Sequence, residues 1–129
     1  MKRMLISMVP VALAQLASPP AAAQDYPRAR FAEQSGAEIY RGICQACHMP
    51  DAQGAVGAGA YPALAANRHL QVALYPVGLV ISGRKAMPAF GDSLTDAQIA
   101  AVVNFVRSNF GNRYKDVVTP EMVSRLRPQ

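Results

Sequence analysis

The sequence is poor in the residues that metal-binding modules use. Its 129 residues include two cysteines and two histidines, with no second C-x-x-C pair and no H-x-x-x-H pair. A tetrahedral zinc site would need both cysteines together with His48 and His69. Cys47 and His48 are adjacent in the chain, which is awkward for that geometry, so a structural metal module is the weaker interpretation of these residues.

Strand patterns are also lacking. No segment shows a convincing alternation of apolar and polar residues, which is the pattern of a half-buried β-strand. Several segments instead repeat apolar residues at helical spacing. We therefore expect an all-α fold with three to four short helices and long loops.

Long hydrophobic runs are limited to the start of the chain. Lys2 and Arg3 precede a mostly apolar stretch over residues 4–16, and three alanines at 21–23 follow a Ser-Pro-Pro break. This order predicts a secretory signal peptide over residues 1–23, cleaved between Ala23 and Gln24, and a periplasmic protein. An uncleaved anchor is the alternative, although the run is broken by Pro10 and is shorter than the roughly 18 residues that span a bilayer. After cleavage we expect no stable membrane span.

Part of the excess positive charge, which is +5 for the whole sequence, lies in the predicted signal peptide. Thirteen Lys and Arg less the two at positions 2 and 3 leave eleven, against eight Asp and Glu, which is a formal charge of +3. This balance gives no case for nucleic acid binding. Docking to a partner could use local basic patches only, such as Arg84 and Lys85 or Arg125 and Arg127.

The remaining 106 residues suffice for one small domain. We expect a flexible lead-in at 24–34, a domain at 35–111 and a C-terminal extension at 112–129. Capping boxes beginning at Ser35 and Thr95 predict two helices, the second running to Phe110 and ended by Gly111. Further helical segments are predicted at 67–74, ending near Tyr75-Pro76, at 77–82, and from Thr119-Pro120 onward.

The most informative motif is Cys44-Gln45-Ala46-Cys47-His48. Two thiols at this spacing can each add to a vinyl group of a haem, and the adjacent histidine can then bind the iron. A thioredoxin-like pair would need a strand–helix context, and a disulfide would close only a very short loop. The motif therefore predicts one covalent haem c, with Cys44 and Cys47 as thioether attachments and His48 as an iron ligand.

The residue on the other side of the iron decides the chemistry. The candidates are Met49, His69, Met87 and Met122. Met49 is bonded to His48 and cannot reach around the macrocycle, whereas Met122 has the spacing of a packing residue and His69 lies in an amphipathic segment. Met87 is followed by proline in a loop between helices, and we favour it as the second axial ligand.

These residues resemble class I cytochrome c over about residues 35–111. The resemblance rests on Gly36 and Tyr40, the C-x-x-C-H motif, residues 57–64, Gly83, Met87-Pro88-Ala89-Phe90, and residues 94–99 through Phe105. It implies a cytochrome c fold around one haem, in which the first and last helices of the domain cross at Gly36 against Phe105. It also implies His48 and Met87 as the axial ligands, and a Pro62 carbonyl that accepts a hydrogen bond from His48.

The resemblance implies a single-electron carrier and not an enzyme. The C-terminal extension (residues 112–129, here called the tail) and the Tyr75-Pro76-Val77 segment are similar to those of cytochrome subunits that accompany periplasmic dehydrogenases. The expected donor is therefore an extracytoplasmic dehydrogenase, and the expected acceptor is a respiratory component such as a terminal oxidase. If Met87 were absent from the iron or easily displaced, the open site could bind a gas or reduce peroxide. That alternative lacks a histidine in the methionine loop to act as acid or base.

Overall fold

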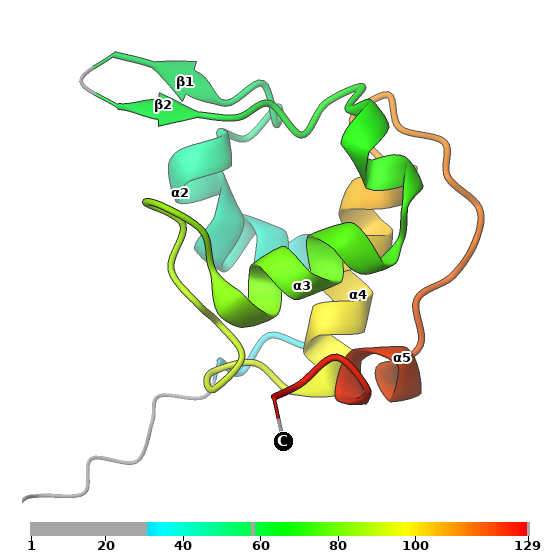
Figure 1. Ribbon diagram of the computed structural model, residues 1–129. Coiled ribbons are helices and arrows are strands. Elements are labelled where there is room, and N and C mark those ends of the chain that lie inside the picture. Colours follow the sequence, from blue (N-terminus) through cyan, green and yellow to red (C-terminus); the bar gives the residue numbers. More distant parts are fainter. Residues whose placement is uncertain (1–30, 58, 129) are drawn as a thin grey trace, which may run out of the picture.

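The computed structural model of the chain describes residues 31–57 and 59–128. Its elements, shown in Figure 1, are helices α1 (Gly36–Ile39), η1 (Tyr40–Cys44), α2 (Gln45–His48), η2 (Arg68–Gln71), α3 (Leu74–Ser82), α4 (Asp96–Ser108) and α5 (Pro120–Ser124), and strands β1 (Ala55–Val56) and β2 (Ala60–Tyr61). The all-α prediction is confirmed. The antiparallel hairpin of β1 and β2 adds to it, because strands of two residues are too short to leave a sequence pattern. The predicted signal peptide and residues 24–30 of the predicted lead-in lie outside the described residues.

Helices α1, η1 and α2 form one continuous helical run that ends at His48. Its start is the predicted capping box. The Ser35 hydroxyl accepts from the Glu38 N–H at 3.2 Å, and the Glu38 carboxylate accepts from the Ser35 N–H at 3.2 Å. In the middle, η1 is a turn of π-helix, in which the Gln45 N–H donates to the Tyr40 carbonyl five residues earlier.

The first helix crosses α4 at Gly36. A Cβ atom at position 36 would lie 2.1 Å from the Ala101 carbonyl oxygen and 2.7 Å from the Phe105 Cβ atom. The two backbones are therefore too close for any side chain, which confirms the predicted crossing. Tyr40, Phe105 and Phe110 form an aromatic cluster beside it, with ring centroids 4.8 to 5.8 Å apart.

The strongest predicted helix is shorter than expected. Helix α4 begins with the predicted Thr95–Gln98 capping box but ends at Ser108, so Phe110 follows the helix in a left-handed conformation with φ of 55°. The prediction that the helix runs to Phe110 and is ended by Gly111 is wrong. The side chains of Ser108 and Asn109 donate to the carbonyls of Asn104 and Phe105, and short polar side chains bonded in this way compete with helix continuation.

The boundary predicted near Tyr75-Pro76 is also wrong. The break lies at Val72 and Ala73, and α3 begins at Leu74, so that Pro76 is in the first helical turn. Proline is tolerated there because the first N–H groups of a helix have no intrahelical acceptor. The helix ends at Gly83 as predicted.

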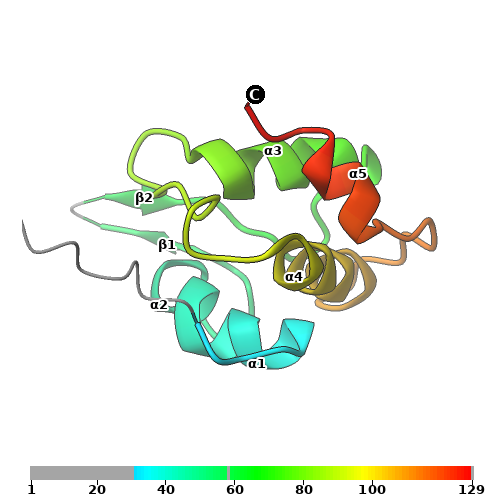
Figure 2. The ribbon, with the colours of Figure 1, turned by 90° about the horizontal axis from the view of Figure 1, so that it is seen from below.

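Figure 2 shows α4 between the N-terminal helical run and the layer of α3 and α5. Apolar side chains from all of these helices are buried around α4; they include Ile39, Tyr40, Val77, Ile81, Ile99, Val102, Val103, Val106 and Val123. None of the helices in the described ranges combines the length and apolar character that crossing a bilayer requires.

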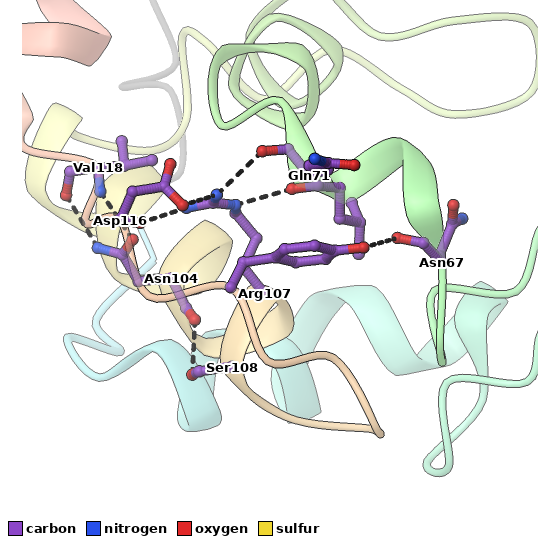
Figure 3. Close-up of polar contacts among 9 residues, drawn as sticks. Asn67, Gln71, Asn104, Arg107, Ser108, Asp116 and Val118 are labelled. Atoms are coloured by element: carbon purple, nitrogen blue, oxygen red, sulfur yellow. Dashed lines mark hydrogen bonds and ion pairs between the residues drawn. The ribbon is translucent and has the colours of Figure 1, made fainter.

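The segment after α4 packs tightly along the domain. Val118 is 2% exposed and Val123 is fully buried. Arg107, which is 1% exposed, anchors this segment through the Asp116 carboxylate, which its guanidinium contacts at 2.6 Å (Figure 3). Its Nε atom also donates to the Leu70 carbonyl of η2 at 2.9 Å, so Arg107 links the segment to η2. Asn104 holds both the N–H and the carbonyl of Val118 at 2.9 Å. Residues 112–128 are thus part of the packed structure and share its core.

Candidate functional site

The C-x-x-C-H motif occupies the end of the N-terminal helical run. Cys44 closes η1, and Cys47 and His48 lie in α2. Both cysteines are free thiols, although they are only three residues apart. Burial raises the pKa of the Cys44 thiol to about 11, so this sulfur stays protonated near neutrality in the haem-free chain. Two half-buried free thiols at this spacing can each add to a vinyl group of a haem and form a thioether.

His48 is held in one orientation by Pro62, the residue that follows β2. Its side chain is 8% exposed, and its Nδ1 atom lies 2.9 Å from the Pro62 carbonyl oxygen. Because a carbonyl oxygen only accepts hydrogen bonds, Nδ1 must carry the proton. The lone pair of His48 is then on Nε2, and this tautomer leaves Nε2 as the nitrogen that can bind a metal.

Gly54 brings the Pro62 carbonyl to the histidine. Its N–H donates to the His48 carbonyl at 3.0 Å, and its backbone has a left-handed φ of 68°. A Cβ atom at this position would lie 2.2 Å from the Tyr61 carbonyl oxygen and 2.8 Å from the Pro62 carbonyl carbon. The absence of a side chain therefore allows the segment after β2 to pass against the backbone that follows His48.

Met87 lies in the loop between α3 and α4, which we call the methionine loop (residues 84–92). Arg84 and Met87 exchange two backbone hydrogen bonds of 3.0 Å, so the tip of the loop is a tight turn with Lys85 in a left-handed conformation. The Met87 side chain is half-buried, whereas Ala86 and Ala89 beside it are exposed. The turn therefore places Met87 in a part of the loop whose neighbouring side chains are small and exposed.

Gly83 sets the entry to the methionine loop. Its φ is 67°, and a Cβ atom there would lie 2.6 Å from the Met87 carbonyl oxygen and 2.7 Å from the Ala89 nitrogen. At the other end, the N–H groups of Phe90 and Gly91 donate to the carbonyls of Val80 and Ile81 in the last turn of α3. Both limbs of the loop are thus fastened to the end of that helix.

The other candidate ligands have different surroundings. His69 is exposed on η2, and its ring packs against Tyr75 with centroids 6.1 Å apart. Met122 packs against the core from α5, while the Met49 carbonyl accepts from the Tyr40 hydroxyl at 2.8 Å. Within residues 31–57 and 59–128, no three His, Cys, Asp or Glu side chains are grouped as a metal site. The zinc alternative therefore finds no support among these residues.

Two arginines make hydrogen bonds to groups far away in the sequence, a role that sequence patterns did not predict. Arg107 is described above, and Arg127 donates to the Asp96 carboxylate at 2.6 Å, to the Leu94 carbonyl at 3.0 Å and to the Gly91 carbonyl. Arg127 is thus engaged within the molecule, and because its side chain is 28% exposed its use as a docking charge stays a prediction. The acceptors are mostly backbone carbonyls distant in sequence, and such contacts leave no local pattern.

The residues at this site fit a covalent haem. The motif supplies two unpaired thiols for thioether bonds, and the hydrogen bond to Pro62 directs the free lone pair of His48 to Nε2. The thioether of Met87 is a soft neutral donor of the kind that haem iron accepts.

Comparisons with known proteins identify the same class. The family model described as "Cytochrome C oxidase, cbb3-type, subunit III" matches residues 31–106. The chain is 35% identical over 106 residues to the gluconate 2-dehydrogenase cytochrome c subunit of Pantoea cypripedii, covering 73% of this chain and 24% of that protein. It is 35% identical to the fructose dehydrogenase cytochrome subunit of Gluconobacter japonicus, covering 71% of this chain and 22% of that protein.

A shorter relative is similar along most of its length. The chain is 34% identical over 118 residues to cytochrome c6 of Thermosynechococcus vestitus, covering 82% of this chain and 91% of that protein. By contrast, it spans about a quarter of the dehydrogenase subunits. The shared part is therefore the cytochrome domain. This chain belongs to the c-type cytochromes, within the family described as cbb3-type cytochrome c oxidase subunit III, and is an electron carrier with covalently bound haem c.

Proposed function

We propose that the chain carries single electrons outside the cytoplasm, with the haem attached to Cys44 and Cys47 and its iron bound by His48 and Met87. The observation that carries this proposal is the hydrogen bond between the His48 Nδ1 atom and the Pro62 carbonyl, because it prepares Nε2 as a ligand. When bound, the haem supplies an iron that takes up and releases one electron.

The chain's own residues explain why transfer would be favoured over bond-making chemistry. His48 is buried and its ring is held by the Pro62 carbonyl, so we expect little movement of this ligand when the iron gains or loses an electron. Met87 offers a neutral sulfur, which favours the reduced metal and raises the reduction potential relative to a harder ligand. With both ligands in place, oxygen and peroxide have no open position at the iron.

The proposed donor is an extracytoplasmic dehydrogenase, and the proposed acceptor is a respiratory component such as a terminal oxidase. Support for the donor comes from the relatives that are cytochrome subunits of gluconate and fructose dehydrogenases. Arg84 and Lys85 are exposed at the tip of the methionine loop, where they could meet an acidic partner surface. The proposed periplasmic location rests on the sequence of residues 1–23.

An optical test separates the electron carrier from the gas-binding or peroxide-reducing alternative. The protein is exported in cells that attach haem, and its spectrum is recorded when ferric and again when ferrous under CO. The expected result is a weak long-wavelength sulfur-to-iron charge-transfer band in the ferric state and no change with CO in the ferrous state. An absent band with a rapid CO shift would contradict the proposal and favour the open-iron alternative.

Matched variants identify which methionine sulfur binds the iron. Met87→Leu preserves approximate side-chain volume but removes the thioether, so it should abolish the band and open the iron to CO. Met122→Leu makes the same chemical change on α5 and should keep the band. Retention of the band in Met87→Leu would show that another residue binds the iron. Haem that stays attached in denaturant, and is lost from Cys44→Ser and Cys47→Ser together, would assign the thioethers.

A further inference from the structure

The outgoing limb of the methionine loop is held by two different parts of the chain. On one side, the Gly91 N–H donates to the Ile81 carbonyl of α3 at 3.1 Å. On the other side, the Gly91 carbonyl accepts from the guanidinium of Arg127, near the C-terminal end of the described residues. The backbone at position 91 is therefore hydrogen-bonded both to the end of α3 and to a side chain of the C-terminal tail.

The same guanidinium ties this limb to α4. Arg127 also donates to the Leu94 carbonyl at 3.0 Å and to the Asp96 carboxylate at 2.6 Å. Both side chains of the ion pair are about 30% exposed, at 28% for Arg127 and 30% for Asp96. Three bonds from one planar group fix the distance between the loop and the first turn of α4, which a single ion pair would not do.

We propose that Arg127 is a positioning residue for the sixth ligand: its guanidinium fastens the methionine loop and so limits how readily Met87 leaves the haem iron. This inference rests on the proposed ligation by Met87. Three residues separate Met87 from Gly91, and the incoming limb is fixed separately by the Arg84–Met87 turn and by Gly83. Loss of the tail anchor would therefore loosen the outgoing limb while leaving the helices and the haem attachment in place.

Binding of free imidazole to the ferric holoprotein measures this effect, because imidazole binds only when Met87 has left the iron. The apparent dissociation constant equals the intrinsic one divided by the fraction of open molecules. Two backbone hydrogen bonds from a charged donor are lost in Arg127→Ala, so imidazole should bind about three- to tenfold more tightly than to the unaltered protein. The charge-transfer band of the ferric protein should weaken or shift in the same variant.

Arg125→Ala is the matched control. Arg125 lies two residues earlier in the tail, and its Nε atom donates to the Glu121 carbonyl at 3.2 Å within its own helix. This control should leave imidazole affinity unchanged. Arg127→Lys keeps a positive charge near Asp96 but cannot donate to all three acceptors, so it should fall between the unaltered protein and Arg127→Ala, and it remains informative if the alanine variant does not fold.

The outcomes separate the two proposals. An unaltered protein without the band, with tight imidazole binding, would overturn ligation by Met87 itself. An unaltered protein with the band, together with unchanged imidazole affinity in Arg127→Ala and Arg127→Lys, would overturn the role of Arg127 alone. A lower melting temperature with unchanged imidazole affinity would likewise overturn it, since Arg127 would then stabilise the fold without positioning the ligand.

Discussion

Replacing Gly36 by alanine tests the helix crossing on which the fold depends. The added Cβ atom would lie 2.1 Å from the Ala101 carbonyl oxygen and 2.7 Å from both the Ala101 carbonyl carbon and the Phe105 Cβ atom. Ordinary contacts of a carbon with these atoms need about 3.4 Å, so α1 and α4 would have to separate by more than 1 Å. Such a shift would also disturb the buried side chains beside the crossing.

The expected size follows from two opposing effects. Alanine gains up to about 1 kcal/mol over glycine from helix propensity, while overpacking of a tight core costs about 1 to 3 kcal/mol, occasionally more. Backbone atoms cannot rotate out of the way, so we expect the upper end of that cost and a net loss of about 2 kcal/mol. Guanidinium unfolding of the holoprotein, followed by circular dichroism, measures this change as a lower midpoint at unchanged slope.

Gly78→Ala is the matched control for the crossing. Gly78 lies within α3, and a Cβ atom there would have no heavy atom within 4 Å. The same chemical change should therefore stabilise the protein by about 0.5 to 1 kcal/mol. If the free energy of unfolding of Gly36→Ala lay within about 0.5 kcal/mol of the unaltered protein, the close crossing would be refuted.

Three further predictions concern buried or paired polar groups. Arg107→Ala should lower the free energy of unfolding by about 2 to 4 kcal/mol, because the buried Leu70 carbonyl loses its donor. Ser108→Ala on the same helix should change it little, and thermal unfolding of the two variants makes the comparison. The hydrogen bond from Arg107 holds the pKa of Asp116 below its usual 3.8. The ionised Asp116 carboxylate therefore stabilises the folded state above pH 3.8, and this contribution is lost as the pH falls through the lowered pKa. The free energies of unfolding of the unaltered protein and of Asp116→Asn should accordingly differ at neutral pH and converge in acid. Burial raises the pKa of Tyr40 to about 12, so an ultraviolet titration should show one phenol that ionises well above the usual pH, and Tyr40→Phe should remove that step. The same variant lacks the hydrogen bond to the Met49 carbonyl, so its free energy of unfolding should be lower by about 0.5 to 1.5 kcal/mol.

Local signals in the sequence predicted the parts of the fold that depend on short-range chemistry. Both capping boxes and the Thr119-Pro120 start are present, because each needs only residues within one helical turn. The helix boundary near Pro76 could not be predicted in this way, since proline is acceptable both after a helix and in its first turn. Phe110 also fits the apolar period of α4, but side chains at 108 and 109 end the helix before it.

The sequence predicted some residues of the candidate site and not others. The spacing of Cys44, Cys47 and His48 is a local signal with a chemical reason, and the approach of the Pro62 carbonyl to His48 followed only from the family resemblance. The anchoring roles of Arg107 and Arg127 could not be inferred, because their acceptors are backbone carbonyls 33 or more residues away, the Asp96 carboxylate 31 residues away, or groups in the irregular segment after α4. Long-range contacts of a side chain to backbone leave no periodicity in sequence.

The π-helical turn at Tyr40–Cys44 determines which chain lengths this domain tolerates. A π turn accommodates one residue more than the α-helix would at the same place, and each residue of an α-helix rotates the direction of its side chain by about 100°. Deleting one residue between Tyr40 and Cys44 would therefore convert the π turn into a regular α-helical turn and leave the thiols and His48 facing in nearly the same direction relative to Gly36. A single-residue deletion within α4, which is α-helical from Asp96 to Ser108, would instead turn every later side chain of that helix by about 100° relative to the crossing.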